Sequence, residues 1–331
     1  MLPWFDNGKF PLYLAPMAGV TDRVFRGLCK ELGADVMVTE FVSAEGILHR
    51  DDRTRHYTEF SDAQRPVGVQ LFGGNPENLA EAARKVVDWK RPDFIDINFG
   101  CPVNKVVSKN GGSSLLRDCP LLAKVAAAIV KAVDVPVTAK IRIGWDQQSI
   151  NAPSVVRLLE EAGVAAIAIH GRTKSQGYSG LADWERIAEA AAATRLPVVG
   201  NGDITCGADV EHRRRTTGVR GVMIGRAAMQ YPWVFREAAA YLATGKQPDP
   251  VPLDQRWDFI LRHARLAVAA DPRGSEPHQM MAMRSRLMHY TKGLPGGKSL
   301  RQRITSVSSI AALEDIAAEH LNSAAEVQQA S

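Results

Sequence analysis

Short runs of β-branched and other apolar residues alternate, over the first 245 residues, with longer stretches whose apolar positions recur every three or four residues. The short runs have the length of strands, and the longer stretches have the periodicity of amphipathic helices. This alternation predicts a parallel sheet, because each helix returns the chain to the same end of the sheet. The eight predicted strands cover residues 12–16, 36–41, 67–72, 94–98, 137–142, 166–170, 198–201 and 221–225. The clearest predicted helices cover residues 75–89, 115–133, 153–163 and 183–194.

Eight strand–helix units in about 240 residues are the number that closes a (β/α)8 TIM barrel. A doubly wound open sheet is the alternative, and it usually carries the pattern G-x-G-x-x-G after its first strand. The first predicted strand leads instead into Ala15-Pro16-Met17-Ala18-Gly19, which lacks that pattern. The predicted fold class is therefore α/β, a (β/α)8 TIM barrel with a C-terminal helical domain.

Polar residues occupy alternate positions in three of the predicted strands, opposite an apolar face. Alternate side chains of a strand point to opposite sides of the sheet. We expect the apolar faces to pack on outer helices and the polar faces to meet at the barrel mouth, where active sites of this fold lie. A purely structural hydrogen bond is the alternative for any one strand, but the repetition favours a site. The polar members are Gln70, Asp96, Asn98, Lys140 and Arg142.

The fourth predicted strand ends at Asn98, and Gly100, Cys101 and Pro102 follow it. A thiol at the barrel mouth can give one proton to a bound ring, and an amide can hold that ring in place. The alternative is a buried apolar thiol, which is common for cysteine. Cys101 differs from that description because a Gly-rich loop over residues 103–114, with Lys109 in it, follows. The loop would either close over a substrate or form a static connection.

Glycines close the last two predicted strands, in Asn201-Gly202-Asp203 and in Gly225-Arg226. Loops after these strands form the usual phosphate site of the fold. Glycine lets backbone N–H groups approach an oxyanion, and arginine adds a paired contact. A glycine turn beside a surface arginine is the alternative reading of each pair.

Two further polar groups are predicted to face the mouth. Lys140 would be an ammonium there and needs an anionic partner, either a carboxylate such as Asp96 or a reduced flavin. His170 ends the sixth strand and would donate a hydrogen bond to a cofactor ring or phosphate. A lone histidine is more often structural, but its position in the strand directs it toward the same mouth.

Composition indicates the kind of protein, whether soluble, membrane-bound or disulfide-rich, but does not decide the function. The chain has 331 residues, of which 45% are apolar and 23% charged, as in ordinary soluble globular proteins. No apolar run reaches the roughly 18 residues that cross a bilayer, and no signal-peptide pattern opens the sequence. Four scattered cysteines without a C-x-x-C pair favour a reducing cytoplasm and argue against disulfides or zinc. The net charge of +5 is a weak indication of a polyanionic partner.

A proline-rich break over residues 245–252 separates residues 1–245, the predicted barrel domain, from residues 250–331, which show helical periodicity alone. Between residues 277 and 313 the chain carries six Lys or Arg and no Asp or Glu. That pattern favours a phosphate-binding surface over a merely solvated face. The six cations are Arg284, Arg286, Lys292, Lys298, Arg301 and Arg303.

Taken as a series, these segments resemble the tRNA-dihydrouridine synthase family, in its bacterial branch with a short N-terminus. They occur in the family's order and spacing and cover most of residues 12–245, and the tail resembles that family's helical domain more loosely. The segments that carry the resemblance are residues 15–22, Gln70, residues 96–102, residues 140–142, residues 170–173, residues 201–203 and residues 225–226.

The resemblance implies an oxidoreductase that reduces the C5=C6 bond of a uridine in tRNA, using FMN reduced by NADPH. It implies a cytoplasmic monomer, without a metal, whose helical domain binds tRNA. Cys101 matches the family's proton donor, Asn98 a residue that contacts the target base, and Arg142 and Arg172 positions near the RNA or the base. The residues that match FMN contacts are Pro16, Met17, Ala18, Gln70, Lys140, His170, Asn201, Gly202, Asp203, Gly225 and Arg226.

Two other functions remain open on the sequence. A flavoenzyme of the same barrel type that acts on a free pyrimidine would share the ring chemistry but would not need a basic tail. An RNA-binding protein without flavin chemistry would have no use for Cys101, Lys140 and His170. No single residue encodes which uridine is modified, or whether NADPH is preferred over NADH.

Overall fold

The computed structural model describes residues 2–6, 8–49, 54–108 and 110–329. Within these residues, nine parallel strands form one sheet, in the order β1-β9-β8-β7-β6-β5-β4-β2, with β3 beside β4. A parallel bridge between Tyr13 and Val36 links β1 to the segment that enters β2, which closes the barrel. The fold is therefore the predicted (β/α)8 TIM barrel, and the open sheet is excluded. The strands are β1 Leu12–Leu14, β2 Met37–Val38, β3 Val42–Ser43, β4 Val67–Phe72, β5 Phe94–Phe99, β6 Val137–Arg142, β7 Ala166–His170, β8 Val198–Asn201 and β9 Gly221–Ile224.

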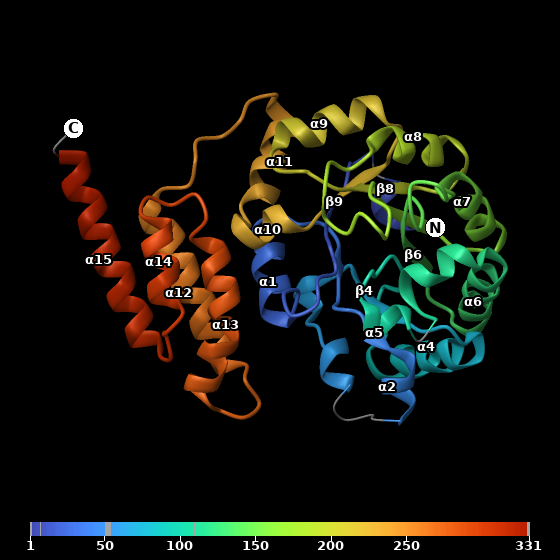
Figure 1. Ribbon diagram of the computed structural model, residues 1–331, viewed down its shortest axis with the longest axis horizontal. Coiled ribbons are helices and arrows are strands. Elements are labelled where there is room, and N and C mark those ends of the chain that lie inside the picture. The colour runs from blue at the N-terminus through green and yellow to red at the C-terminus, as the bar shows by residue number, and fades with distance from the viewer. Residues whose placement is uncertain (1, 7, 50–53, 109, 330–331) are drawn as a thin grey trace. The chain divides into compact units, whose positions relative to one another are not determined.

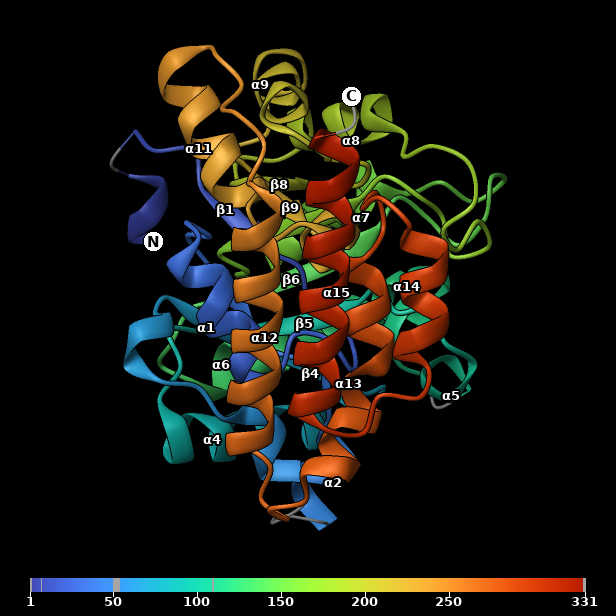
Figure 2. The ribbon, with the colours of Figure 1, turned by 90° about the vertical axis from the view of Figure 1, so that its left-hand side faces the viewer.

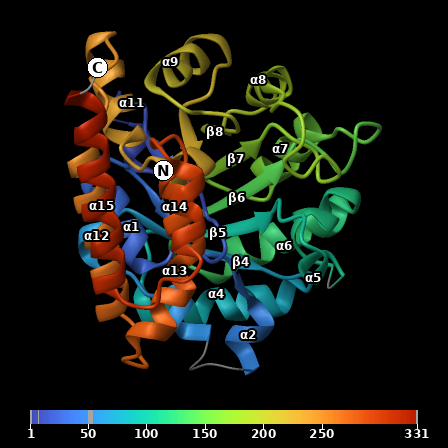
Figure 3. The same ribbon diagram turned by 60° about the vertical axis from the view of Figure 1, so that its left-hand side comes forward.

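Outer helices surround the strands, as Figure 1 shows, and Figure 3 shows β4 to β8 side by side in sequence order. Their first turns are closed by side chains that sequence patterns favour at helix starts. Asn75 accepts a hydrogen bond from the Asn78 amide, and Asp118 accepts one from the Leu121 amide. The helices of this unit are α1 Arg23–Glu31, α2 Ala44–His49, α4 Pro76–Lys90, α5 Asn104–Val107, α6 Cys119–Ala132, α7 Ala152–Glu161, α8 Trp184–Ala192, α9 Gly207–Thr216 and α11 Val234–Thr244.

The predicted strand over residues 36–41 is wrong in its extent, because the structure has two short strands, β2 and β3, with a break between them. The physical cause is Thr39, whose hydroxyl accepts a hydrogen bond from the Gln70 amide at 3.1 Å. That side chain takes the place of a backbone carbonyl in the sheet ladder, so regular pairing stops there. The predicted helix over 115–133 likewise begins later, at Cys119, because Asp118 caps it.

The segment predicted as a loop over residues 103–114 is partly regular. It contains α5 and the start of a 3₁₀ helix, Gly112–Arg117. Lys109 lies outside the described residues. The Cys101 carbonyl accepts hydrogen bonds from the Ser113 amide and hydroxyl, at 3.1 and 2.8 Å, so the segment is tied back to the barrel.

The barrel interior is apolar at the amino end of the strands and polar at the carboxyl end. Tyr13, Val36, Phe94 and Met223 belong to one buried apolar cluster in the interior. The indole of Trp4, in the N-terminal segment, donates to the Tyr13 hydroxyl at 2.6 Å and packs against this cluster. The barrel is thus a packed core, and its polar side chains gather at the opposite end, where active sites of this fold lie.

The chain divides into two compact units, residues 1–225 with 234–247, and residues 226–233 with 248–331. The second unit is helical, and Figure 2 shows α12 and α15 running side by side in it. Its predicted helical periodicity is confirmed, and on one helix of this unit Met280, Met283, Leu287 and Tyr290 are all buried. None of the described helices has both the length and the apolar composition that crossing a membrane requires. The helices of this unit are α10 Arg226–Gln230, α12 Leu253–Ala269, α13 Glu276–Tyr290, α14 Gly297–Ile304 and α15 Ile310–Gln329.

Candidate active site

Cys101 is held at the carboxyl end of β5 by the side chain of Asn98. The Asn98 Oδ1 atom accepts hydrogen bonds from the backbone amides of Gly100, at 3.1 Å, and Cys101, at 2.8 Å. The two bonds hold the backbone directly after the strand and fix the peptide that carries the thiol. Cys101 is 7% exposed, so it is buried but not sealed from solvent.

A chain of buried polar side chains leads from Asn98 across three strands. Asn98 Nδ2 donates to Gln70 Oε1 at 2.8 Å, and Gln70 Nε2 donates to Asp96 Oδ2 at 2.6 Å. The other Asp96 oxygen accepts a hydrogen bond from the Thr138 hydroxyl. Because Asp96 accepts at both ends, it fixes which way the Gln70 amide points, and Gln70 in turn fixes Asn98. Side chains of β4, β5 and β6 therefore form one network that positions Cys101, with Thr138 as its member from β6.

Burial dominates the electrostatics of this network. Burial raises the pKa of the Cys101 thiol, while a backbone hydrogen bond and the charges of Arg142 and Lys140 act in the opposite direction. Burial also raises the pKa of Asp96, against hydrogen bonds from Thr138 and Gln70 and the charge of Lys140. The thiol is therefore protonated at neutral pH, the form that an acid needs.

We expect Asp96→Leu to destabilise the protein by about 1–3 kcal/mol for each of the two donors that it leaves without an acceptor. Asp96→Asn is the matched control, because its carbonyl can accept from Gln70 while the Thr138 hydroxyl rotates to accept from its amide. The free energy of unfolding in urea measures both. Equal destabilisation by the two variants would exclude the polar chain as the cause.

The titration of Asp96 makes the stability of the protein depend on pH in a known direction. The folded protein binds the Asp96 proton more tightly than the unfolded chain, because the pKa is raised above its ordinary value of 3.8. Its contribution to stability is therefore present below that value and is lost as pH rises through the raised pKa. Asp96→Asn removes this component, so the stability curves of the variant and the unaltered protein should diverge above pH 3.8.

Lys140 lies opposite Asn98 in the register of β5 and β6 and reaches the mouth. Its ammonium donates to Asn201 Oδ1 at 3.2 Å. The Asn201 amide nitrogen donates to the Met223 carbonyl at 2.7 Å, which turns Oδ1 toward the lysine. No carboxylate among the described residues forms an ion pair with Lys140. Burial, and next the charge of Arg142, lower its pKa to about 8.

Arg142 is buried, and its guanidinium binds backbone carbonyls from two loops. It donates to the Gly100 carbonyl at 2.9 Å, to the Thr173 carbonyl at 2.8 Å and to the Gly177 carbonyl at 2.9 Å. These bonds join the turn that carries Cys101 to the loop after β7. Arg142 is 3% exposed, so these contacts point to a role in loop positioning.

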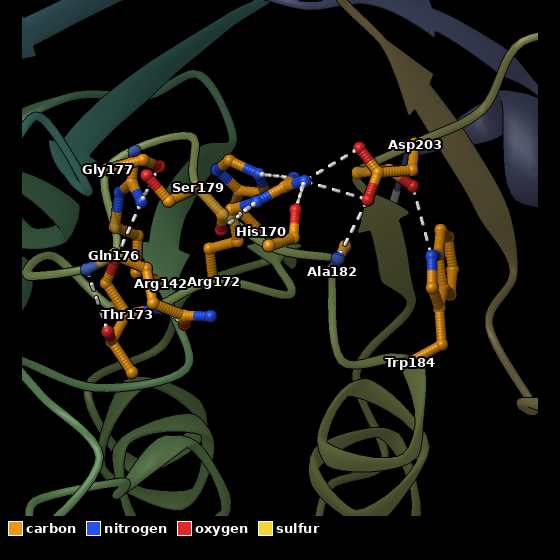
Figure 4. Close-up of polar contacts among 12 residues, drawn as sticks. Arg142, His170, Arg172, Thr173, Gln176, Gly177, Ser179, Ala182, Trp184 and Asp203 are labelled. Carbon is orange, nitrogen blue, oxygen red and sulfur yellow. Dashed lines mark hydrogen bonds and ion pairs between the residues drawn. The ribbon is translucent and has the colours of Figure 1, made fainter.

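His170 and Asp203 are linked through Arg172, as Figure 4 shows. Arg172 donates to both Asp203 oxygens, at 2.8 and 2.9 Å, and to His170 Nε2 at 3.3 Å. Trp184 donates to the Gly202 carbonyl at 3.0 Å and supports the turn before Asp203. That turn has φ of +131° at Gly202 and +51° at Asp203, where a left-handed backbone favours glycine.

The ends of β1 and β9 meet at the same face. A Cβ added at Gly225 would lie 3.5 Å from both Ala15 Cβ and Met17 Sδ, which is ordinary contact distance. A small side chain would therefore fit at residue 225 without a clash. Because glycine has none, a small space remains beside Met17. Pro16 and Met17 are half-buried, and Ala18 is exposed. Arg226 is exposed and begins α10, in the second unit.

A family model described as dihydrouridine synthase matches residues 13–326 of the chain. The chain belongs to the dihydrouridine synthase family. Among curated relatives, "tRNA-dihydrouridine synthase B" of Xanthomonas campestris pv. campestris is 43% identical over 288 residues, 87% of this chain and 86% of that protein. "Probable tRNA-dihydrouridine synthase" of Aquifex aeolicus is 38% identical over 303 residues, 91% and 92% of the two chains.

Among solved structures, a histamine dehydrogenase from Rhizobium sp. 4-9 superposes with a TM-score of 0.53. It is 16% identical and covers 71% of this chain and 45% of its own. At that identity the likeness concerns the barrel fold alone.

The basic residues predicted for RNA binding differ in their surroundings within the helical unit. Lys292 and Lys298 are exposed, whereas Arg284 donates to the Val307 carbonyl at 2.8 Å. Arg286 lies 3.4 Å from His263 Nε2, and Arg303 pairs with Glu319 at 2.8 Å. Arg301 is half-buried in α14. The two lysines are therefore the side chains most directly open to a ligand.

Two residues, Thr138 and Trp184, were not predicted as site residues. Thr138 and Asp96 anchor the polar chain. Asp96 was predicted to face the mouth, and the interior position of Thr138 in β6 was the available signal. Trp184 was not singled out, since it is one apolar residue at a helix start. Over the described part of the chain, no cluster of three or more His, Cys, Asp or Glu side chains is arranged to hold a metal ion.

Proposed function

We propose that this dihydrouridine synthase is an FMN-dependent enzyme that reduces the C5=C6 bond of a uridine in tRNA, with Cys101 as the proton donor. The observation that carries the proposal is a buried thiol, held at the mouth of a barrel whose sequence matches the family model from residue 13 to residue 326. Burial raises the pKa of this thiol. The relatives' names supply the tRNA substrate and the dihydrouridine product.

The mouth has donors and apolar side chains of the kind that a flavin needs. Lys140 is a cation whose hydrogen bond within the protein is to a neutral amide, so an acceptor or anion satisfies it better. The open side of Gly225 and the half-buried Pro16 and Met17 offer an apolar surface on which a flat ring can lie. We therefore propose these residues, with Asn201, Gly202 and His170, as the flavin site.

When bound, FMN supplies the hydride that the uracil C6 atom receives, and NADPH is the proposed source of that hydride. Negative charge then develops at C5 and O4 of the uracil, and the Cys101 thiol gives its proton to C5. The added hydride and proton together account for the saturated C5–C6 bond. The Asn98 turn and Ser113 hold the peptide of Cys101, so the thiol need not be repositioned before the transfer.

Gln70, Arg142 and Arg172 have a different proposed role from the direct contacts expected from the sequence. Gln70 is 0% exposed, and both arms of its amide bind the polar chain. Arg142 and Arg172 direct their guanidinium groups to the backbone and to Asp203. We propose that all three position the mouth, and that Asn98 acts on the base through its hold on Cys101.

We propose that the helical unit binds the tRNA backbone, and that its two exposed lysines contribute to this binding. Lys292→Gln with Lys298→Gln should lower tRNA affinity and reduce the slope of log Kd against log salt by about 1.5, two phosphate contacts at about 0.7–0.9 each. Lys124→Gln with Lys131→Gln removes two exposed charges from α6 and is the matched control. An equal change in both slopes would contradict the assignment.

A reconstitution experiment tests the proposed activity. Purified protein is given FMN, NADPH or NADH, and either an unmodified tRNA transcript or free uracil and uridine. Mass spectrometry should find dihydrouridine at defined positions of the tRNA and none in the free pyrimidines. Reduction of the free pyrimidines alone would favour the alternative function. Tightly bound RNA without any reduction would favour an RNA-binding protein.

A further inference from the structure

Two cations lie over the indole ring of Trp145 at the carboxyl end of the barrel. The Arg117 guanidinium carbon is 3.9 Å from the ring centre, and the Lys174 ammonium is 4.4 Å from it. Because both distances end at the same ring centre, the two like charges lie no farther apart than the sum of these distances. Arg117 ends the 3₁₀ helix after β5, Trp145 follows β6 and Lys174 follows β7, so three loops build this Trp145 cluster.

Hydrogen bonds join the three loops directly beside these side chains. The Lys174 amide donates to the Gly144 carbonyl at 3.0 Å, and the amide of the next residue donates to the Trp145 carbonyl at 2.9 Å. The Asn151 side chain donates to the Leu116 carbonyl at 2.8 Å, next to the arginine of the cluster. The backbone that carries the cations is therefore fixed, and binding a ligand there costs little ordering of the loops.

The carboxylates that adjoin the Trp145 cluster in the chain serve their own loops. Asp118 caps α6, and Asp146 accepts a hydrogen bond from the Ser149 hydroxyl at 2.7 Å. Over the part of the chain that the structure describes, neither Arg117 nor Lys174 forms an ion pair with a carboxylate. The electron-rich face of the indole offsets only part of the repulsion between two cations, so an anion would stabilise the cluster.

The Trp145 cluster is also tied to the residues that hold Cys101. The 3₁₀ helix that ends at Arg117 contains Ser113, whose hydroxyl donates to the Cys101 carbonyl. The guanidinium of Arg142 donates to the carbonyls of the residues that precede Cys101 and Lys174. The two cations therefore belong to the same end of the barrel as the thiol.

We propose that the Trp145 cluster binds phosphate of the tRNA backbone beside the uridine that enters the mouth. This assignment rests on the proposed function. A uridine whose base leaves its stack to reach Cys101 keeps its flanking phosphates outside, at the rim. Arg117 is exposed, and Trp145 and Lys174 are half-buried, so all three are open to such a group. Guanidinium N–H groups pair with phosphate oxygens, and an ammonium adds a compact charge.

The first test is the salt dependence of tRNA affinity, measured by filter binding with the full-length protein. Arg117→Gln with Lys174→Gln should weaken binding and reduce the slope of log Kd against log salt by at least about 0.7, the share of one phosphate contact. Lys124→Gln with Lys131→Gln removes two exposed charges from α6 and is the matched control. An equal change of slope in the two double variants would overturn the proposal.

Ethylation interference locates the contact on the RNA. Ethylation neutralises one phosphate at a time, and sequencing of the bound fraction identifies the phosphates whose charge binding requires. With the unaltered protein, the phosphates that flank the target uridine should be among them. With Arg117→Gln and Lys174→Gln combined, these phosphates should disappear from the set and the others should remain. An unchanged set would overturn the proposal.

Two variants of Trp145 test the part played by the indole. Trp145→Phe keeps an aromatic face under the cations and should bind tRNA nearly as well as the unaltered protein. Trp145→Leu removes that face and should bind tRNA about two- to fivefold more weakly. Equal affinities of the two variants would contradict a role for the ring.

Reduction of the bound flavin by NADPH, without tRNA, distinguishes the other phosphate that reaches the mouth. Its rate should be unchanged in Arg117→Gln with Lys174→Gln. Slower reduction together with normal tRNA affinity would overturn the proposal in favour of a phosphate of the nicotinamide cofactor. The binding measurements require no turnover. Absence of dihydrouridine with the unaltered protein would refute the proposed function, whereas an unchanged salt slope would refute this assignment alone.

Discussion

Cys101→Ala should leave FMN bound and lower dihydrouridine formation by about 10²-fold or more. The thiol is the acid that the uracil C5 atom requires, and burial raises its pKa, so the proton is present at neutral pH. The Asn98 turn binds the backbone amide of residue 101, which alanine retains, so the fold of the mouth should persist. Single-turnover formation of dihydrouridine in an unmodified tRNA, with flavin absorbance recorded in parallel, measures both expectations.

Cys119→Ala is the matched control. Cys119 is a half-buried thiol whose pKa is also raised, first by burial and then by the charge of Asp118, but it lies at the start of α6. A raised pKa alone therefore does not mark the donor, and this variant should react at nearly the normal rate. In the unaltered protein the rate should fall as pH rises through the raised thiol pKa. Normal turnover by Cys101→Ala would remove this thiol from the mechanism.

Lys140→Met should bind FMN about tenfold or more weakly than the unaltered protein at pH 7, because a charge-assisted hydrogen bond contributes about 1.5–3 kcal/mol. The methionine keeps much of the length and volume of the lysine stem, so the loss reports the ammonium. Asn201 loses a donor but keeps its bond to the Met223 carbonyl. Quenching of flavin fluorescence during titration measures the affinity.

The pH dependence separates charge from shape. The pKa of Lys140 is about 8 without a ligand, and an acceptor bound to the ammonium raises it. Affinity should therefore be constant below pH 8 and fall, by at most tenfold per pH unit, above it. Lys140→Arg keeps its charge over this range and should show no such fall, whatever its affinity. An identical decline in the lysine, arginine and methionine forms would exclude Lys140 as its source.

The sequence predicted most of the barrel because each central strand is determined by residues close to one another in the chain. The residues of β4, β6, β7 and β8 have the predicted bounds, since the apolar face of each strand and the turns at its ends are set by neighbouring residues. The same alternation predicted that Lys140 and Asn98 would face one interior. Their proximity follows from the register of β5 with β6, in which the two residues are paired.

Other features required partners that are distant in the chain. Thr39 ends β2 because its hydroxyl meets the Gln70 amide from a strand about thirty residues later, so the period of the strand alone gave the wrong extent. The family resemblance placed Arg172 near the RNA or the base, and the sequence could not correct this, because an exposed and a buried arginine look alike in a sequence. The Asp203 carboxylate that binds it becomes visible only when β7 and β8 lie side by side.

The sequence by itself determined that this chain forms a closed barrel followed by helices. It also determined that the Asn98 amide and the Lys140 ammonium face the barrel interior and that the Cys101 thiol comes directly after a strand. Periodicity and turn residues act over a few positions, so they can be recognised in the sequence alone. Tertiary structure alone decided the hydrogen-bond partners of those groups. Asp96 orients Gln70, Gln70 orients Asn98, and Asn98 holds Cys101, because a buried polar group binds the nearest partner in space.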